Sequence, residues 1–392
     1  MLNSLNNIQQ SYSVAFADYV RLKESEGKQI IKMQTGDPDF DTHPVIIEAA
    51  QKGLKEGATK YSDSRGLIEL RNAIADKLLN ENNINADPQT NILVTHGAVH
   101  AIGVSIRAIV NIGDECIIVE PYWRSYEANV LLSGGKPIFV KTLKEESFHL
   151  NADRVIQKTN SKTKLIIINT PNNPSGAVYE KDQLTKLAEY ASQKGIFIIS
   201  DEVYESIIFD NKKHFSMASN PSVFDWVISV FSFSKTHAMT GWRIGYLVAS
   251  KQFVDEVLKL SQFSITSLSP YSQLGALKAI NDNDSLAFSV KMRLEYMERR
   301  DFIIEKIKGT WLEKACTIPS GAFYLLIDVS VFNIPSLQLV KKLVDSANVS
   351  FTPGIAFGDS MDFYIRLCFA TSLENISIAI ESLIKFEDSY NY

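Results

Sequence analysis

Short apolar runs alternate with amphipathic stretches along the middle of the chain. The runs are rich in Val, Ile and Phe and lie at 91–95, 115–121, 136–140, 164–171, 196–202, 226–232 and 243–249. Such continuous apolar runs are typical of strands buried on both faces of a mainly parallel sheet. Between two of them, residues 182–195 predict a helix with one apolar face and a stop at Gly195. The apolar face consists of Leu184, Leu187, Ala188 and Ala191. This repetition of strand and helix predicts an α/β fold, with a wound, mainly parallel seven-stranded sheet flanked by helices.

The pattern changes after residue 285. A long charged helix, a strand at 321–328, a helix at 336–347, two further strands and a closing helix at 371–386 predict a smaller α+β domain. The polar stretch 281–285 is typical of a link between subdomains. A helical stretch near 10–26 is expected to pack on the smaller domain or on a partner subunit. We therefore predict a large domain at 45–284 and a small domain built from 1–44 and 285–392.

Composition and charge narrow the class of protein. The 392 residues include 40 Lys and Arg against 45 Asp and Glu, a net charge of -5, and no basic stripe, so we expect no nucleic-acid partner. No window of 18 apolar residues and no secretory leader pattern occurs, which indicates a cytoplasmic protein without a membrane partner. The three cysteines, Cys116, Cys316 and Cys368, are far apart in apolar runs and are expected to be reduced. They lack CxxC spacing, and His96 precedes the helix expected to hold His100, so we expect no metal site.

The segment 232–246 has the strongest chemical character. It follows a buried strand and contains Lys235 flanked by hydroxyl residues, with Arg243 eight residues further on. Ligands bind beyond the carboxyl ends of strands in α/β sheets, so a Schiff-base amine beside an anion site is one interpretation. A lysine in a solvated loop is the alternative, and the segment alone does not decide between them.

The chain resembles the fold type I pyridoxal-phosphate (PLP) enzymes, and within them the class I/II aminotransferases. Nine motifs occur in family order between about residue 28 and residue 385: MQTGDPDF, TKYSDSRGLIELR, VTHGAVHA, EPYWRSY, NTPNNPSGAV, SDEVY, SFSKTHAMTGWRIGY, PSGAFY and IRLCFAT. Each motif alone is weak, but nine in order are specific. The resemblance implies a PLP-dependent aminotransferase that moves the α-amino group of an L-amino acid to a 2-oxo acid in two ping-pong half-reactions.

The resemblance also implies a set of cofactor residues. Lys235 matches the lysine that forms the Schiff base and also shuttles the proton. Asp201 matches the carboxylate that keeps the pyridine nitrogen protonated. Tyr204 matches a hydrogen-bond donor to the phenolic oxygen of the ring. The other implied cofactor contacts are Ser232 and Arg243 for the phosphate, Gly97, Ala98 and Val99 at a helix start, Asn173 beside the ring oxygen and Trp123 stacked on the ring.

The substrate and partner residues follow from the same motifs. Arg366 matches the arginine that binds the substrate α-carboxylate, with Gly36 and Asn173 beside it. Tyr61 matches a tyrosine that reaches the cofactor phosphate of the neighbouring subunit, so the resemblance implies a homodimer.

Three positions depart from the family pattern and keep an alternative open. Val99 stands where relatives that use dicarboxylates often have Lys or a hydroxyl residue, which disfavours a strict aspartate enzyme. His43 and His237 are unusual, and each is either a packing residue or a second acid/base group near the cofactor. With such a group the same scaffold supports a C–S β-lyase or an oxygen-dependent amino acid oxidase. A non-catalytic ligand sensor is disfavoured, because the four residues Lys235, Asp201, Arg243 and Arg366 are all present and no DNA-binding head is.

Overall fold

The seven apolar runs form the seven strands of one sheet. The computed structural model describes residue 8 and residues 12–390, and its main sheet has the strand order β2-β8-β7-β6-β5-β3-β4. The strands are β2 (Ile92–Thr95), β3 (Glu115–Glu120), β4 (Lys136–Lys141), β5 (Thr163–Asn169), β6 (Phe197–Asp201), β7 (Val227–Ser232) and β8 (Gly245–Val248). Neighbouring strands are parallel except at β8, which is antiparallel to both β2 and β7. The predicted α/β sheet is confirmed. The expectation that every strand is buried on both faces is wrong for β4, an edge strand in which only Val140 is buried.

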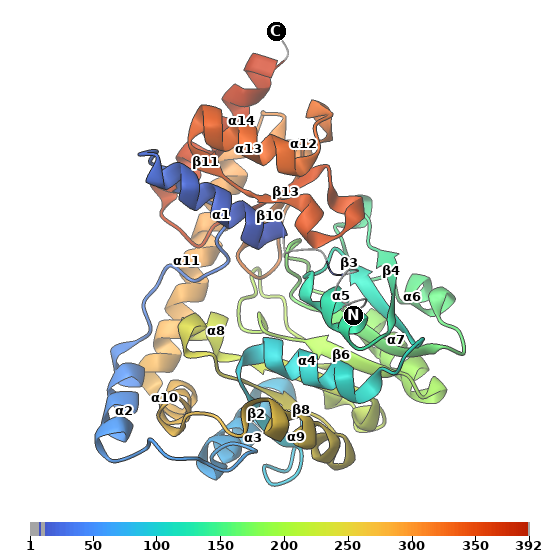
Figure 1. The fold of residues 1–392 in the computed structure, drawn as a ribbon. Helices are drawn as coiled ribbons and strands as arrows, with labels where there is room; N and C mark the ends of the chain where they lie inside the picture. The colour runs from blue at the N-terminus through green and yellow to red at the C-terminus, as the bar shows by residue number, and fades with distance from the viewer. Residues whose placement is uncertain (1–7, 9–11, 391–392) are drawn as a thin grey trace, which may run out of the picture.

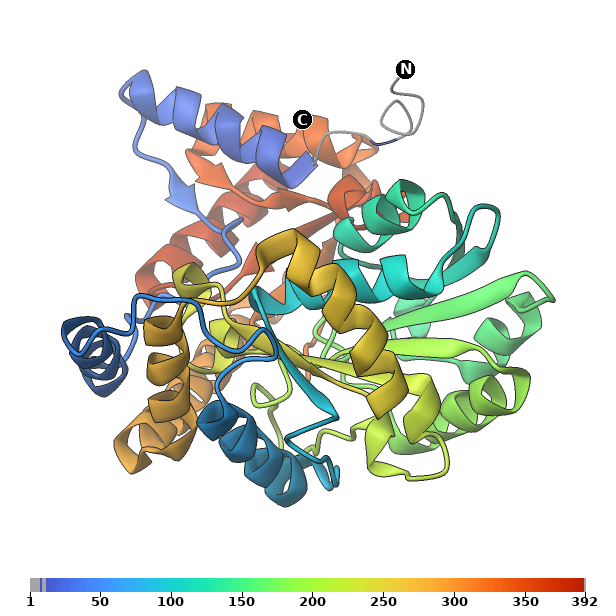
Figure 2. The same ribbon diagram turned by 60° about the horizontal axis from the view of Figure 1, so that its bottom comes forward.

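Helices cover both faces of this sheet (Figure 2). One face packs against α4 (Gly97–Ile109), α5 (Ser125–Leu132) and α9 (Lys251–Ile265). The other packs against α2 (Pro44–Lys55), α3 (Ile68–Asn82), α6 (Ala152–Lys158), α7 (Lys181–Lys194) and α10 (Pro270–Asn281). The helix predicted at 182–195 is α7, with the four expected apolar residues buried and Gly195 left-handed at its end.

The strand directions bring distant parts of the chain to one edge of the sheet. The carboxyl ends of β2, β3, β5, β6 and β7 meet there because these strands run in the same direction. Since β8 runs the opposite way, its beginning lies at the same edge, where Gly245 pairs with both Thr95 and Ser232. Arg243, two residues before β8 on the chain, is thereby placed beside the ends of β2 and β7. Ligands bind at such an edge in α/β sheets.

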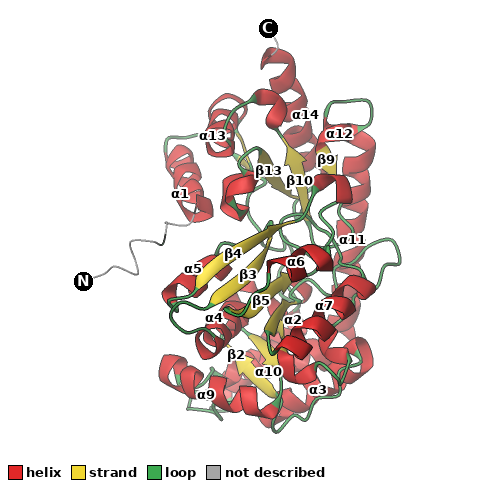
Figure 3. Cartoon of the chain, turned by 90° about the vertical axis from the view of Figure 1, so that its right-hand side faces the viewer, coloured by secondary structure: helices red, strands yellow, loops and turns green. Residues whose placement is uncertain are grey.

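The remaining elements build a second lobe around its own core (Figures 1 and 3). Its four-stranded sheet has the order β12-β13-β10-β9, and a two-stranded sheet pairs β1 with β11. The strands are β9 (Cys316–Thr317), β10 (Tyr324–Asp328), β12 (Thr352–Pro353), β13 (Tyr364–Cys368), β1 (Ile31–Lys32) and β11 (Val349–Ser350). The helices are α1 (Tyr12–Ser25), α11 (Asn283–Ile307), α12 (Leu312–Ala315), α13 (Ser336–Ala347) and α14 (Leu373–Tyr390). Helix α1 packs on this lobe, since Phe16 and Val20 are part of its core.

Short elements complete the connections. The short helix α8 (Phe233–Thr236) follows β7 directly. The 3-10 helices are Lys144–Glu146, Met217–Ser219, Phe224–Trp226, Thr240–Trp242, Ser330–Phe332, Gly354–Phe357 and Asp359–Met361. The expected link at 281–285 is a single residue: Asp282 lies between α10 and α11 and caps α11 by accepting hydrogen bonds from the amides of Asp284 and Ser285 at 3.0 and 3.2 Å.

Among the described helices, none is long and apolar enough to cross a membrane. The three cysteines are free, two of them buried and Cys316 half-buried.

Candidate active site

A cavity of about 550 Å³ lies at the strand-end edge of the main sheet, and the residues that line it come from both lobes. We call it the sheet-edge cavity. Eleven of the thirteen residues predicted from the sequence line it: Gly36, Ala98, Val99, Trp123, Asn173, Asp201, Tyr204, Ser232, Lys235, Arg243 and Arg366. Gly97, which lies against the lining residue Arg243, and Tyr61 do not line the cavity. The Tyr61 side chain is 88% exposed on the surface.

Lys235 projects from α8 into this cavity. Its Nζ donates a hydrogen bond to the backbone oxygen of Gly36 at 2.7 Å and lies 3.9 Å from the carboxylate of Asp37. Burial lowers the pKa of Lys235 to about 8, an effect that Asp37 opposes and Arg366 and Arg243 reinforce. A lowered pKa makes the neutral, nucleophilic amine accessible near neutral pH.

Asp201 ends β6 at the floor of the cavity. Its Oδ2 accepts a hydrogen bond from the Tyr126 hydroxyl at 2.5 Å, and its Oδ1 accepts one from the amide of Val203 at 3.3 Å. Burial raises the pKa of this carboxyl to about 6. An anion buried in this way is stabilised when a cation binds against it.

The end of the cavity near β2, β7 and β8 is suited to an anion. The guanidinium of Arg243 lies against Gly97 at the start of α4, where an added Cβ would come within 2.6 Å of Nη2. Gly97 also has a φ of +74°, so this position requires glycine on two grounds. The Ser232 oxygen accepts a hydrogen bond from the amide of Ser234 at 3.1 Å, which leaves its own proton for a ligand. A guanidinium, a hydroxyl and a helix N-terminus together form a phosphate-binding arrangement.

Arg366 forms the opposite end of the cavity. The side chain is 6% exposed, and its guanidinium lies 4.2 Å from the ring centre of Tyr324 and 5.0 Å from that of Phe357. Nη1 donates to Asn173 Oδ1 at 2.8 Å and Nη2 to the backbone oxygen of Gln34 at 2.8 Å, while the buried Nε has no partner. A buried cation with an unsatisfied donor is prepared to bind a carboxylate.

Aromatic side chains close the walls of the cavity. Tyr204 and Tyr324 share a hydrogen bond between their hydroxyls at 2.7 Å, and burial raises the pKa of Tyr204. Trp123 stands edge-on to Tyr126, with ring centres 5.7 Å apart. At Gly36 a Cβ would come within 2.7 Å of the Tyr324 hydroxyl, so the backbone approaches Tyr324 only because this residue is glycine.

The two unusual histidines lie outside the sheet-edge cavity. The His43 Nδ1 accepts a hydrogen bond from the amide of Val45 at the start of α2, and its ring packs on Phe288. His237 is buried behind α8 and lines a different cavity. Since neither ring lines the sheet-edge cavity, the hypothesis of a histidine acid/base group there is unsupported.

One group of side chains has the composition of a metal site. The ligand atoms of Glu202, Glu205 and His214 lie within 4.8 Å of one another. They already have partners, however: His214 Nε2 lies 2.6 Å from Glu202, and the two carboxylate oxygens of Glu205 accept from Lys77 and Asn82. This group is therefore an internal network of hydrogen bonds and ion pairs.

The whole arrangement is that of a known family. The family described as Aminotransferase class I and II matches residues 28–383, and the chain belongs to it. An aspartate aminotransferase of Pyrococcus abyssi is 38% identical over 91% of this chain and 92% of its own, and an aromatic-amino-acid aminotransferase of Thermococcus litoralis is 36% identical over 91% of both. The solved aspartate aminotransferase of Thermus thermophilus with maleate superposes with a TM-score of 0.93 at 34% identity, covering 98% of this chain and 99% of the other.

This protein is accordingly an amino acid aminotransferase that uses PLP. The cavity fits that cofactor by its own chemistry. Its lining combines a guanidinium and a hydroxyl suited to a phosphate, a buried carboxylate that a cation would stabilise, and a lysine with a lowered pKa.

Several residues of the cavity were missed from the sequence. Tyr126 holds Asp201, Tyr324 packs on Arg366, and Asn169 accepts the amide of Asn173 on Oδ1 at 2.8 Å. Tyr126 lies in the motif EPYWRSY, which also contains Trp123, and Tyr324 lies in the motif PSGAFY. The motifs could therefore have pointed to both tyrosines. Their roles depend on distances between strands that sequence spacing does not give.

Proposed function

We propose that the predicted residues of the sheet-edge cavity form the active site, with Lys235 as its central group. The observation that supports this most directly is the presence of Lys235 in one buried cavity with Asp201, Arg243 and Arg366. When bound, PLP withdraws electrons from the α-carbon of an amino acid and so weakens its Cα–H bond. Lys235 holds the cofactor through its amine and, once released, takes and returns the proton at Cα.

The other assigned residues position the reactants around Lys235. Arg243, Ser232 and the start of α4 at Gly97, Ala98 and Val99 bind the phosphate. Asp201, oriented by Tyr126, keeps the pyridine nitrogen protonated. Tyr204 and the amide of Asn173 bind the ring oxygen. Because Asn173 Oδ1 already accepts from Arg366, its NH₂ group is free to donate. Trp123 covers the ring.

We propose that Arg366 binds the α-carboxylate of both substrates, the L-amino acid and the 2-oxo acid. Its guanidinium is fixed between Tyr324 and Phe357, so little side-chain entropy is lost on binding. Gly36 leaves room for the substrate beside this residue. Both half-reactions use the same site, which is the basis of ping-pong kinetics.

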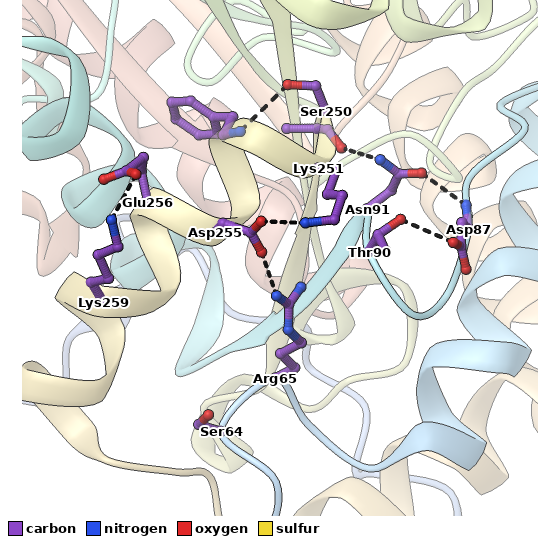
Figure 4. Close-up of polar contacts among 12 residues, drawn as sticks. Ser64, Arg65, Asp87, Thr90, Asn91, Ser250, Lys251, Asp255, Glu256 and Lys259 are labelled. Atoms are coloured by element: carbon purple, nitrogen blue, oxygen red, sulfur yellow. Dashed lines mark hydrogen bonds and ion pairs between the residues drawn. The ribbon is translucent and has the colours of Figure 1, made fainter.

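We further propose a homodimer in which Tyr61 of one subunit reaches the phosphate of the other. Tyr61 is 88% exposed and does not contact its own sheet-edge cavity. Four residues on, the chain is held to α9, because Arg65 binds the carboxylate of Asp255 at 2.5 Å, and Lys251 of the same helix binds this carboxylate at 2.6 Å (Figure 4). Because the segment is anchored and Tyr61 protrudes from it, this tyrosine is suited to reaching the active site of a neighbouring subunit.

The same proposal includes the domain division and the cellular location. We assign the main sheet and its helices to a large domain at 45–284, and the second lobe to 1–44 and 285–392. Two of the three apolar clusters lie mainly in the first part and the third mainly in the second, which supports this division, although Tyr204 belongs to the cluster of the second lobe and Phe357 to one of the first part. Three free cysteines support a reducing compartment such as the cytoplasm. The lyase and oxidase alternatives depended on His43 and His237, and neither residue lines the cavity.

A hybrid-dimer experiment tests the assignment of Lys235 and Tyr61 together. Lys235→Ala and Tyr61→Phe chains with different affinity tags are co-expressed, and the mixed dimer is purified and compared with both parents. One site of the mixed dimer has an intact lysine from one chain and an intact tyrosine from the other. We expect its kcat/KM to reach about half that of the wild type while Lys235→Ala alone is inactive. A mixed dimer no more active than the Tyr61→Phe parent would contradict the shared site.

A further inference from the structure

A second cavity of about 450 Å³ lies on the other side of α8 from the sheet-edge cavity. We call it the rear cavity. Its wall toward the active site consists of Ser232, Phe233, Thr236 and His237, and its opposite wall includes Ser289 and Arg293 of α11. Ser232 lines both cavities, whereas Lys235 lines only the sheet-edge cavity. The volume is in the range of small-molecule sites.

Most charged groups of the rear cavity are already paired. Lys77 binds Glu205, whose second oxygen accepts from Asn82 at 2.6 Å, and Lys77 also lies 3.8 Å from Glu81. The guanidinium of Arg293 has neither an ion pair nor a hydrogen bond among the described residues, although the side chain is half-buried. Arg293 therefore provides an unpaired positive charge at the wall of the cavity, which an anion can neutralise.

His237 presents a hydrogen-bond acceptor to the same space. The Ser289 hydroxyl lies 3.1 Å from the backbone oxygen of Ser285 and 3.2 Å from His237 Nδ1, and when it donates to the carbonyl oxygen the imidazole proton is on Nδ1. Burial lowers the pKa of His237 to about 3, and the ring is neutral. Its Nε2 then carries a lone pair and makes no hydrogen bond to any residue that the structure describes.

The face of α11 that borders the cavity combines this polarity with apolar surface. Leu286, Ser289, Val290 and Arg293 are spaced three and four residues apart, so they share one face of the helix. Ser289 and Arg293 are about one turn apart, so their Cα atoms are separated by about 6 Å along the helix axis. One small molecule in the rear cavity could therefore contact the positive charge of Arg293, the acceptor of His237 and the apolar surface of α11.

We propose that the rear cavity binds a small organic carboxylate that has a hydrogen-bond donor near its carboxylate and an apolar body. Arg293 binds the carboxylate, His237 Nε2 accepts from the donor, and Leu286 and Val290 contact the apolar part. The ligand lies against α8 from the side opposite to Lys235. This proposal does not depend on the residue roles proposed for the active site.

Calorimetric titration of the holoenzyme with L-3-phenyllactate tests the proposal. This probe has a carboxylate, a neighbouring hydroxyl and a phenyl ring, and it can neither donate nor accept an amino group. We expect two equivalents per chain, one at Arg366 and one in the rear cavity. Arg293→Gln should weaken one of the two by at least ~10-fold, the value expected for loss of a charge-assisted contact. Arg366→Gln should remove only the other.

Arg107→Gln is the matched control, because Arg107 is an exposed arginine on α4 and lines neither cavity. It should bind two equivalents with wild-type affinity. A single equivalent that Arg366→Gln abolishes would overturn the proposal. So would two equivalents whose affinities Arg293→Gln leaves unchanged.

Discussion

Replacing Lys235 by methionine should stabilise the protein without its cofactor, although it abolishes the reaction. Lys235 is half-buried, with 17% of its side chain exposed, and desolvation lowers its pKa from 10.5 to about 8. The folded state therefore binds this proton less tightly than the unfolded chain does, and at pH 7 the folded protein carries an unfavourable buried charge. Methionine keeps a side chain of similar length and removes that charge.

The size of the effect follows from the pKa. A difference of about 2.5 units at 1.36 kcal/mol per unit gives ~3 kcal/mol at pH 7. An unfolding entropy of roughly 2.1 cal/mol/K per residue converts ~3 kcal/mol into a rise in melting temperature of about 4 °C for a chain of this length. As the pH rises from 8 to 10.5, the wild-type lysine loses its proton in the folded state, so the gain should shrink and then vanish.

Thermal unfolding of the two apoproteins between pH 6.5 and pH 10.5 measures this difference. Lys194→Met is the control, because Lys194 is exposed at the end of α7 and its replacement should cause no pH-dependent change. A Lys235→Met protein that melts below the wild type at pH 7, or a difference independent of pH, would refute the reasoning.

Three further substitutions separate the roles of the cavity. Asp201→Asn should lower kcat by about 10²-fold or more and should stabilise the apoprotein at pH 7. Because burial raises the pKa of Asp201 from 3.8 to about 6, this gain in stability develops between pH 4 and pH 6 and should be absent in unfolding scans below pH 4. Arg366→Gln should raise KM for the amino acid by ~10²-fold or more in steady-state kinetics, while the affinity for PLP in a cofactor titration stays unchanged. Equal weakening of amino acid binding and PLP binding would argue against the assignment of Arg366 to the substrate carboxylate. Gly97→Ala should weaken PLP binding, measured by spectroscopic titration, because the added methyl group would displace Arg243. An unchanged affinity for PLP would exclude Arg243 as a cofactor-binding residue in this position.

The fold could be predicted to a large extent because its strands are short and continuously apolar. All seven runs became strands, and the helix at 182–195 formed with its predicted face buried. The antiparallel direction of β8 could not be predicted from periodicity, which is the same in both directions. The exposure of β4 was missed although its sequence KPIFVK contains Pro137, which has no amide proton to donate and is typical of an edge strand.

The site could be predicted where a motif names a residue type, but not where a role depends on contacts between elements. Lys235, Asp201, Arg243 and Arg366 line one cavity because they lie after β7, at the end of β6, before β8 and within β13. Tyr126, which orients Asp201, was missed because its role depends on a contact across 75 residues of sequence. His237 was noticed as unusual, but only the structure places it behind α8.

A single half-reaction tests the central claim most directly. The purified holoenzyme is mixed without oxygen with one L-amino acid at a time, without any 2-oxo acid, and the products are quantified. The account predicts that a substrate amino acid yields one equivalent of its 2-oxo acid per Lys235, without ammonia and without further turnover until a second 2-oxo acid is added. Lys235→Ala should yield none. Continued turnover with release of ammonia, or an undiminished yield from Lys235→Ala, would contradict it.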